Sequence, residues 1–256
     1  MKNLTCVERM ERIMHNRIAI FGLTGDPFTI AHRDICKRAI DTLQIDKLYV
    51  IPTVVDYHRK GKERWLTDLQ RVYCMEKMLW TLGNEYREKY EIDTHELMLK
   101  SMCENDIGLY NEIIKPRRFI HTLLDFKCRL AKEYDVLEPP EIVLIIGSDE
   151  LHMFQSWHRW DAVSNNINYL VVVNGRDNTE LEIPVPIEIK FRGRLMTMEL
   201  SESYLYNVSA TAVRHWYKND GLKEYLDDVK KLDDGELDWL TIPWINKAHK
   251  EQEHAK

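Results

Sequence analysis

Two side chains that could bind phosphate, Thr29 and His32, lie three positions apart near the N-terminus. Residues at this spacing share one face of a helix, so a hydroxyl and an imidazole would face the same ligand. A turn with two glycines and an Asp-Pro pair, residues 22–27, comes before them. Free backbone N–H groups at a helix start attract phosphate, so the pattern predicts an anion-binding site. The alternative is a glycine turn ahead of an amphipathic helix with a surface histidine.

A buried strand and a helix must flank this turn if it is to hold an anion. Residues 18–21 (Ile-Ala-Ile-Phe) form a short apolar run, which predicts a strand. From Thr29 to Leu43, apolar residues recur at helical spacing. Strand, turn and helix are therefore expected in succession.

Strand-like and helix-like segments alternate along the rest of the chain. This alternation predicts an α/β fold, a Rossmann-like parallel sheet with helices on both faces. Ligands of such sheets bind beyond the carboxyl ends of the strands, so Gly22, Thr53 and Gly147 are expected to border one cleft. Strands are expected at residues 47–53, 141–147, 169–173 and 195–200, and helices at residues 67–82 and 119–134.

One main domain is expected, at residues 17–217. Residues 1–16 would be an N-terminal extension and residues 218–256 a helical, charged C-terminal segment. Residues 83–116 are less regular and rich in charge, which indicates an insertion that serves as a lid or an oligomer contact. The sequence leaves open whether the chain forms a homo-oligomer.

Composition narrows the class of protein. The chain has 256 residues, 44% of them hydrophobic, and a net charge of −6, which argues against a nucleic-acid partner. No segment approaches the roughly 20 apolar residues of a membrane span, and residues 1–16 lack the apolar core of a signal peptide. A cytoplasmic protein without a membrane partner is expected.

The five cysteines are dispersed and include no Cys-x-x-Cys pair, which argues against a disulfide framework or a zinc site. No metal-ligating residues are predicted. Cys36 lies one turn beyond His32, so a covalent nucleophile is an alternative, although nothing else in the sequence indicates one.

A second candidate phosphate site lies at residues 208–214 (Val-Ser-Ala-Thr-Ala-Val-Arg). Ser209 is a good helix N-cap. Its hydroxyl, the free N–H groups near Thr211 and the guanidinium of Arg214 could together hold the outer phosphates of a nucleotide. The alternative is a capped surface helix with one arginine.

These patterns, in this order, resemble the nucleotidyltransferase superfamily (cytidylyltransferase-like). Its first signature, Gly-x-x-x-x-Pro-x-(His or Thr)-x-x-His, matches residues 22–32, and its second, Ile-Ser-x-Thr-x-x-Arg, matches residues 208–214. Residues 147–151 and Trp157 resemble the Gly-x-Asp-x-Leu…Trp element of nicotinate and nicotinamide mononucleotide adenylyltransferases. Residues 56–62 resemble the Asp-x-Tyr-x-Lys-Lys element, and Arg71 resembles the arginine of an Arg-x-x-Met element.

The resemblance implies roles for individual residues. Trp157 would stack on the electron-poor pyridinium ring, for which Trp offers the strongest aromatic face, whereas ordinary core packing is the alternative for Trp157 and Trp160. The resemblance implies four catalytic residues: His32, Thr29, Arg214 and Lys60. The implied ATP-binding residues are Gly22, Leu23, Thr24, Thr29, His32, Ser209, Thr211 and Arg214. The implied substrate-binding residues are Thr53, Tyr57, Gly147, Asp149 and Trp157.

The chain departs from the family pattern at several positions. Leu23 and Ala31 replace small residues, and Gly25 replaces an aromatic residue whose space Phe28 is expected to fill. The family's Ser-Tyr-x-x-x-Thr-Leu element survives only as Thr122 and Leu123. Arg117 and Arg118 precede it and are candidates for binding the mononucleotide phosphate.

The expected activity is transfer of AMP from ATP to nicotinate or nicotinamide mononucleotide, with Mg²⁺ accompanying ATP and pyrophosphate released. The sequence does not distinguish the two acceptors. One alternative is an adenylyl- or cytidylyltransferase for phosphopantetheine or a phospho-alcohol. Another is a nucleotide-binding sensor without turnover. A class I tRNA synthetase is disfavoured because the chain lacks the expected size and a Lys-Met-Ser-Lys-Ser loop.

Overall fold

A computed structural model describes residues 17–54, 65–114, 117–133, 139–175, 181–201, 208–211 and 213–214. The predicted N-terminal extension, the C-terminal segment, Tyr57 and Lys60 lie outside these residues. Among the described helices, none is long and apolar enough to cross a membrane.

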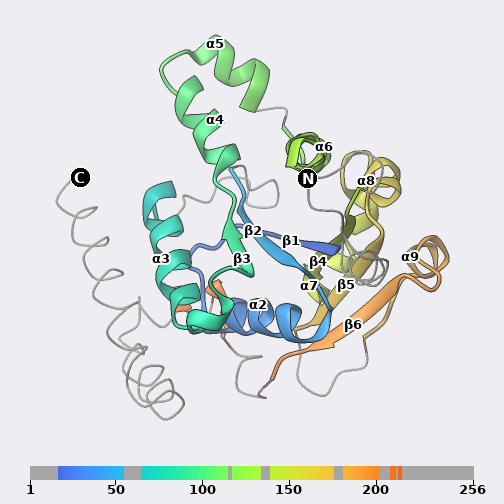
Figure 1. Ribbon diagram of the computed structural model, residues 1–256. Coiled ribbons are helices and arrows are strands. Elements are labelled where there is room, and N and C mark those ends of the chain that lie inside the picture. The colour runs from blue at the N-terminus through green and yellow to red at the C-terminus, as the bar shows by residue number, and fades with distance from the viewer. Residues whose placement is uncertain are drawn as a thin grey trace, which may run out of the picture.

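Six strands form one parallel sheet at the centre of the molecule (Figure 1). The spatial order is β3-β2-β1-β4-β5-β6. Strands β2 and β3 are added on one side of β1, and β4, β5 and β6 on its other side, so β1 pairs with both β2 and β4. This confirms the predicted α/β fold with a Rossmann-like parallel sheet. The strands are β1 (Arg17–Leu23), β2 (Lys47–Pro52), β3 (Tyr90–Ile92), β4 (Glu141–Gly147), β5 (Tyr169–Asn174) and β6 (Leu195–Glu199).

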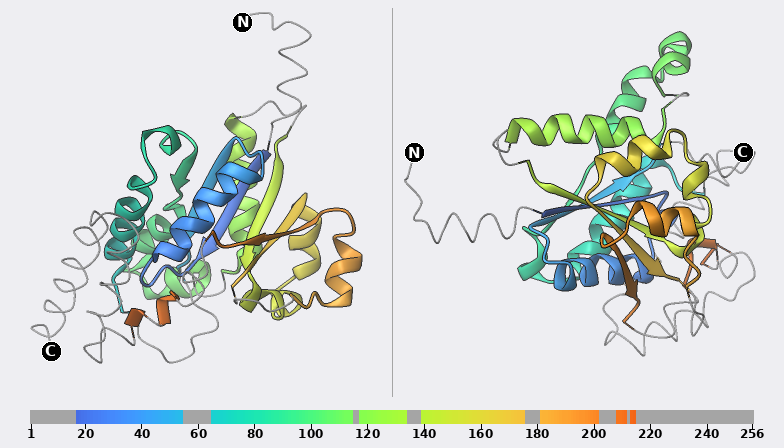
Figure 2. Two further views of the ribbon diagram at one scale, coloured as in Figure 1. Left: turned by 90° about the horizontal axis from the view of Figure 1, so that it is seen from below. Right: turned by 90° about the vertical axis from the view of Figure 1, so that its right-hand side faces the viewer.

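Helices cover both faces of the sheet, as the right-hand view of Figure 2 shows. Successive side chains of a strand point to opposite faces. In β1, Ala19 and Phe21 pack with α2 (Ile30–Thr42) and α3 (Asp68–Trp80), in one core cluster. Ile18 and Ile20 pack in a second cluster, on the face covered by α6 (Phe119–Glu133), α8 (Trp160–Asn166) and α9 (Val185–Lys190).

Strand β3 was not expected, because residues 83–116 had been interpreted as an insertion. Its three residues pair with β2 in parallel, Val50 opposite Ile92, and form one edge of the sheet. Three residues are too few to show the alternation by which a strand is recognised in a sequence. The neighbouring elements are η1 (Asn84–Tyr86), α4 (His95–Cys103), α5 (Ile107–Leu109) and η2 (Tyr110–Ile114).

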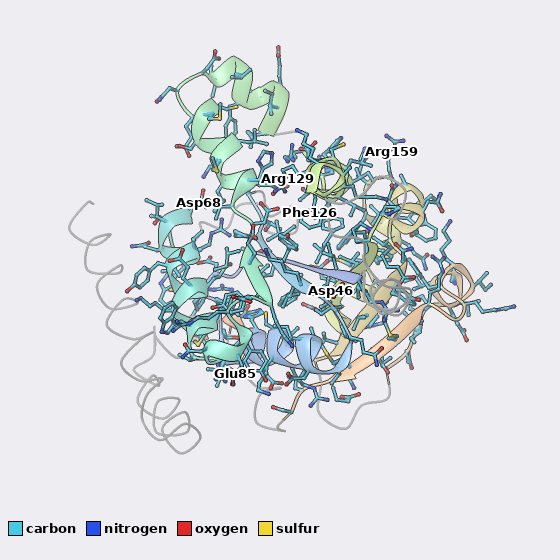
Figure 3. All side chains as sticks on the ribbon, in the orientation of Figure 1. Asp46, Asp68, Glu85, Phe126, Arg129 and Arg159 are labelled. Carbon is cyan, nitrogen blue, oxygen red and sulfur yellow. The ribbon has the colours of Figure 1, made fainter. Side chains whose placement is uncertain are left out.

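Helices α4 and α5 project away from the sheet (Figure 1) and are tied to the body of the molecule by charged contacts. Lys100 of α4 contacts Asp68 of α3, with 2.5 Å between Nζ and Oδ2. Arg129 of α6 forms an ion pair with Asp93, which lies just after β3, and the guanidinium of Arg129 stands 5.4 Å from the ring centroid of Phe126. Asp68, Arg129 and Phe126 mark these contact regions in Figure 3.

Candidate active site

A cavity of about 390 Å³ opens where the carboxyl ends of β1, β2 and β4 meet. Its wall includes Gly22, Thr53 and Gly147, so the prediction that these residues border one cleft is confirmed. This place is the switch point of the sheet, where open α/β folds bind ligands. The wall also includes Leu23, Thr24, Val54, Glu96, Arg117, Arg118, Phe119, Thr122, Glu150, Trp157 and His158.

The short elements after β4 place Trp157 on this wall. Helix α7 (Ser148–Leu151) and η3 (Phe154–Ser156) turn the chain, and Phe154, fully buried, packs edge-on against the indole with 5.0 Å between ring centroids. Phe119 packs against the same indole at 5.2 Å and an interplanar angle of 60°. Two aromatic neighbours therefore orient Trp157. The Nε1 atom of Trp157 is buried and has no hydrogen-bond partner among the described residues.

Asp149 does not line the cavity, although it was predicted to bind the substrate. Its side chain is exposed, and the carboxylate lies against the backbone of Gly147, where an added Cβ would collide with it. Glu150, the next residue, contributes to the cavity wall instead.

The turn between β1 and α2 has a conformation that requires glycine. Gly25 has φ of +57°, which L-residues with side chains rarely adopt. The position of a Cβ at Gly25 is occupied by the Cε atom of Met75, from α3. Met75 therefore fills the space that Phe28 was expected to fill. Phe28 instead packs on the imidazole of His32, with 5.2 Å between ring centroids.

Thr29 and His32 come together at the start of α2, as their spacing predicts. The backbone N–H of Thr29 donates to Nδ1 of His32 over 3.0 Å. Burial lowers the pKa of His32 from 6.5 to about 4, so the imidazole is neutral at neutral pH. Because Nδ1 accepts this hydrogen bond, the single ring proton is on Nε2, which can donate to a ligand.

The second predicted phosphate segment contacts the first. The hydroxyl of Thr29 donates to the carbonyl oxygen of Val208 over 3.2 Å. The guanidinium of Arg214 donates to the carbonyl oxygen of Asp26 and, from Nη2, to Thr211 Oγ1 at 2.9 Å. Thr211 and Ser209 are exposed. Residues 26–32 and 208–214 thus form one surface, from segments far apart in the sequence.

Two buried carboxylates position this surface. Asp26, fully buried, accepts from the backbone N–H groups of Trp65 and Leu66, at 3.0 and 2.8 Å. Asp34 of α2 accepts from the backbone N–H of Ser201 at 2.8 Å and from its hydroxyl. Since Ser201 follows β6, this contact holds the chain at the end of β6 beside α2.

Arg71 joins the ends of β1 and β2. Its side chain is fully buried and donates to the carbonyl oxygens of Thr24 and Thr53, the latter at 3.1 Å, and to Asp68 Oδ1 at 2.6 Å. Thr24 and Thr53 both line the cavity. Arg71 therefore shapes the cavity rim from behind, without lining the cavity itself.

Of the two arginines before Phe119, Arg117 has its charge compensated within the protein. Arg117 is buried between carboxylates: its Nε donates to Glu96 Oε1 at 3.1 Å, and its Nη2 pairs with Asp125. Glu96 also accepts from the hydroxyl of Thr122 and from the backbone N–H of Val54 at 3.3 Å. Arg117 is thus neutralised by protein groups, which argues against the predicted role of this arginine in phosphate binding.

Cys36 is unsuited to covalent catalysis. Its side chain is fully buried, and burial together with the nearby charge of Asp34 raises the pKa of the thiol. The thiolate is the nucleophilic form, so a raised pKa suppresses reactivity. The described cysteines are Cys36, Cys74, Cys103 and Cys128, and all four are free thiols.

Sequence reasoning missed part of the cavity wall. Glu96 lies in the segment interpreted as an insertion, and nothing in its local pattern points to a site. Phe119 could have been suspected from the sequence only weakly. It lies three residues before Thr122, which matches part of the family's Ser-Tyr-x-x-x-Thr-Leu element. His158, beside Trp157, stacks on His121 of α6 at 6.3 Å between ring centroids and closes that side of the wall.

The geometry defines a class of protein: an α/β protein with a cavity at the switch point of a parallel sheet and a strand–turn–helix segment that fits phosphate. The model of the cytidylyltransferase-like family matches residues 20–215. The chain belongs to this family and is a nucleotidyltransferase.

Relatives and solved structures are in line with this assignment. A "probable nicotinate-nucleotide adenylyltransferase" of Campylobacter jejuni is 23% identical over 215 residues, which cover 84% of this chain and 95% of that protein. One of Campylobacter fetus is 29% identical over 64% of this chain and 74% of that protein. The chain is also similar to the structure of the Plasmodium falciparum nicotinic acid mononucleotide adenylyltransferase complexed with NaAD, with a TM-score of 0.50 and 16% identity. The match covers 86% of this chain and 98% of that chain, and it supports the fold.

Proposed function

We propose that the protein transfers AMP from ATP to a pyridine mononucleotide, giving a dinucleotide and pyrophosphate. The observation that carries this proposal is the indole of Trp157 on the wall of the switch-point cavity, held edge-on by Phe119 and Phe154. An electron-poor pyridinium ring suits the face of an indole. The names of the Campylobacter relatives favour nicotinate mononucleotide as the acceptor.

The reaction requires no general base. A phosphate oxygen of the mononucleotide attacks the α-phosphorus of ATP, the bond from that phosphorus to the β-phosphate oxygen breaks, and pyrophosphate leaves with the electron pair. The acceptor phosphate is already an anion, so catalysis consists of positioning and charge stabilisation. Because His32 is neutral with its proton on Nε2, it would donate to a phosphate oxygen around the reacting centre.

Six other residues complete the proposed site for the nucleotide and the acceptor. Thr29 would contact the same phosphates as His32. Arg214, Ser209 and Thr211 would hold the leaving pyrophosphate, on the surface that residues 26–32 and 208–214 form together. Lys60 is proposed as a second phosphate clamp, and Tyr57 as a substrate contact, by resemblance alone.

Mg²⁺ is proposed to accompany ATP. Among the described residues, no group of three His, Cys, Asp or Glu side chains could hold a metal ion. An ion held mainly by phosphate oxygens and water, as is common for Mg²⁺, does not need such a group of side chains. When bound, the ion would neutralise negative charge on the phosphates.

Pyrophosphate release tests the proposal. The full-length protein is incubated with ATP, Mg²⁺ and either nicotinate or nicotinamide mononucleotide, and with phosphopantetheine as a rival acceptor. Release that depends on a pyridine mononucleotide is expected. A nucleotide-binding sensor would bind ATP and release nothing, and a transferase for another acceptor would respond only to phosphopantetheine.

Two tryptophan variants sharpen this test. Trp157→Ala is expected to raise KM for the mononucleotide by about 10-fold or more, since stacking on an aromatic face contributes about 1–3 kcal/mol per base. Trp160→Ala is the control, because Trp160 does not line the cavity and packs near Lys190 on α9. Equal effects of the two substitutions would contradict a stacking role for Trp157.

A further inference from the structure

Glu96 is a buried carboxylate that α4 contributes to the wall of the cavity, together with Val54, Arg117 and Thr122. One of its oxygens, Oε2, accepts from the backbone N–H of Val54, just beyond β2, at 3.3 Å. The other, Oε1, accepts from Nε of Arg117 at 3.1 Å and from the hydroxyl of Thr122 on α6. A single side chain therefore joins α4, the end of β2 and the start of α6 at the cavity.

The hydrogen bond between Glu96 and Thr122 fixes the turn of α6 that carries Phe119. Phe119 and Thr122 lie three positions apart, so they share one face of the helix. Phe119 packs against the indole of Trp157, with 5.2 Å between ring centroids. A shift of this turn would break the hydrogen bond to Glu96 and move the ring of Phe119 relative to the indole. Glu96 thus holds Trp157 in place through two intermediate side chains.

Only an ionised carboxylate at position 96 satisfies all of these donors. Its two oxygens can accept all three hydrogen bonds, whereas an amide of the same shape has one acceptor oxygen and an NH₂ group that only donates. In Glu96→Gln the NH₂ group would face either the N–H of Val54 or the donors of Arg117 and Thr122. The substitution keeps the shape of the side chain but breaks at least one of its links.

The surface proposed to hold ATP is fixed by other groups. Residues 26–32 and 208–214 contact each other directly, and the carboxylates of Asp26 and Asp34 hold the chain beside them. The three hydrogen bonds of Glu96 reach the end of β2 and the start of α6 instead. A change at Glu96 should therefore act where the acceptor ring would stack more than where ATP would bind.

We infer that Glu96 is a positioning residue for the acceptor: by holding the start of α6, it keeps the indole of Trp157 in the orientation that receives the pyridine ring. The inference rests on the proposed function and adds a residue that acts on acceptor binding through other side chains. It also assigns a role to part of residues 83–116, because α4 then builds one side of the acceptor site.

Steady-state pyrophosphate release by full-length Glu96→Gln protein, with ATP and nicotinate mononucleotide, tests the inference. KM for the mononucleotide is expected to rise about 10-fold, in line with the loss of one hydrogen bond to a charged group, whereas KM for ATP and kcat should change only a few fold. Thr122→Val removes one link and no charge, so it should raise the same KM by a smaller factor. This second variant answers the question even if Glu96→Gln does not fold.

Asp93→Asn is the matched control. Asp93 is also a buried carboxylate of residues 83–116 and also pairs with an arginine of α6, Arg129 (Figure 3). It accepts from the backbone N–H of His95 at 3.0 Å and does not line the cavity. Asp93→Asn should lower the free energy of unfolding, measured with urea, as Glu96→Gln does, but leave KM for the mononucleotide unchanged. The pair separates positioning from a general loss of stability.

A double-mutant cycle with Trp157→Ala shows whether Glu96 acts through the indole. Without the indole, Glu96 has no ring to orient, so Glu96→Gln should add little to the KM of Trp157→Ala protein. Calorimetric titration with nicotinate mononucleotide gives the same cycle as binding affinities, without the need for turnover.

The possible outcomes separate the inference from the proposed function. An unchanged KM for the mononucleotide in Glu96→Gln would overturn the inference, as would an equal rise in Asp93→Asn, an equal rise of KM for ATP, or additive effects in the double-mutant cycle. The proposed function would stand in each of these cases. Wild-type protein that neither binds nor adenylylates a pyridine mononucleotide would overturn the proposed function and, with it, the role of Glu96.

Discussion

Thr29 and His32 fix each other at the first turn of α2: the backbone N–H of Thr29 occupies Nδ1 of His32, so the imidazole has one proton, on Nε2. The low pKa of His32, about 4, keeps the imidazole in this state. A neutral donor of fixed tautomer can stabilise charge that develops on a phosphate oxygen, and it needs no rearrangement during the reaction.

Removal of the imidazole should therefore affect turnover more than ATP binding. In His32→Ala, kcat is expected to fall about 100- to 1000-fold, the range for loss of one donor to a developing anion, with a change in KM for ATP of only a few fold. Steady-state pyrophosphate release measures both constants. Turnover close to that of the wild type would contradict the role proposed for His32 in the reaction.

The pH dependence of the free energy of unfolding should reveal the lowered pKa of His32. The unfolded chain protonates His32 near pH 6.5, whereas the folded protein resists protonation until about pH 4. Between these values the unfolded state binds more protons, so the free energy of unfolding falls as the pH drops from 6.5 to 4.

His32→Gln keeps an acceptor for the Thr29 N–H, as in a capping box, but does not titrate. Denaturant unfolding at pH 7.5 and 5 should show a smaller loss of stability in His32→Gln than in the wild type; equal losses would contradict the assignment.

Arg214→Lys tests the second phosphate segment. The guanidinium of Arg214 donates to the Asp26 carbonyl and to the Thr211 hydroxyl, and one ammonium on a flexible stem cannot reproduce this geometry. We expect kcat/KM for ATP to fall about 10-fold or more, as for loss of a charge-assisted hydrogen bond. Arg33 makes the same kind of contacts, to the carbonyl and hydroxyl of Thr81, away from the cavity. If Arg33→Lys lowered kcat/KM as much, the effect would be structural.

Arg71→Met should destabilise the fold strongly. It would leave the carbonyl groups of Thr24 and Thr53 without their buried cationic donor, and breaking a buried charged contact costs about 3–5 kcal/mol. Arg87 is exposed and stacks on Trp80, a contact worth about 1 kcal/mol or less. Urea unfolding of Arg71→Met and Arg87→Met compares the two, and similar losses of stability would show that the role assigned to Arg71 is wrong.

The sequence predicted the parts of the fold with strong local patterns. The apolar runs of β1 and β4, the helical spacing of α2 and the glycine turn between β1 and α2 depend on near neighbours, so they could be found without the structure. The residues that line the cavity from elsewhere could not, because their roles come from tertiary contacts. Glu96 acts through Arg117 and Thr122, 21 and 26 positions away, and Met75 fills the space at Gly25 from another helix.

Charge pairing was likewise invisible in the sequence. Arg117 and Arg118 are adjacent and chemically identical, and both were candidates for binding phosphate. Only the fold shows that two carboxylates, from α4 and α6, surround the first of them. A linear pattern cannot report that carboxylates from two other parts of the chain compensate the charge of Arg117.

The contact between Thr29 and Val208 joins residues 179 positions apart. The last described strand of the sheet ends at Glu199, so a chain still attached to the ribosome can form the described strands before residues 208–214 emerge. Such a nascent chain would hold the cavity but lack Arg214. If Arg214 holds the leaving pyrophosphate as proposed, a product that terminates shortly after the sheet would lack a residue that the reaction needs.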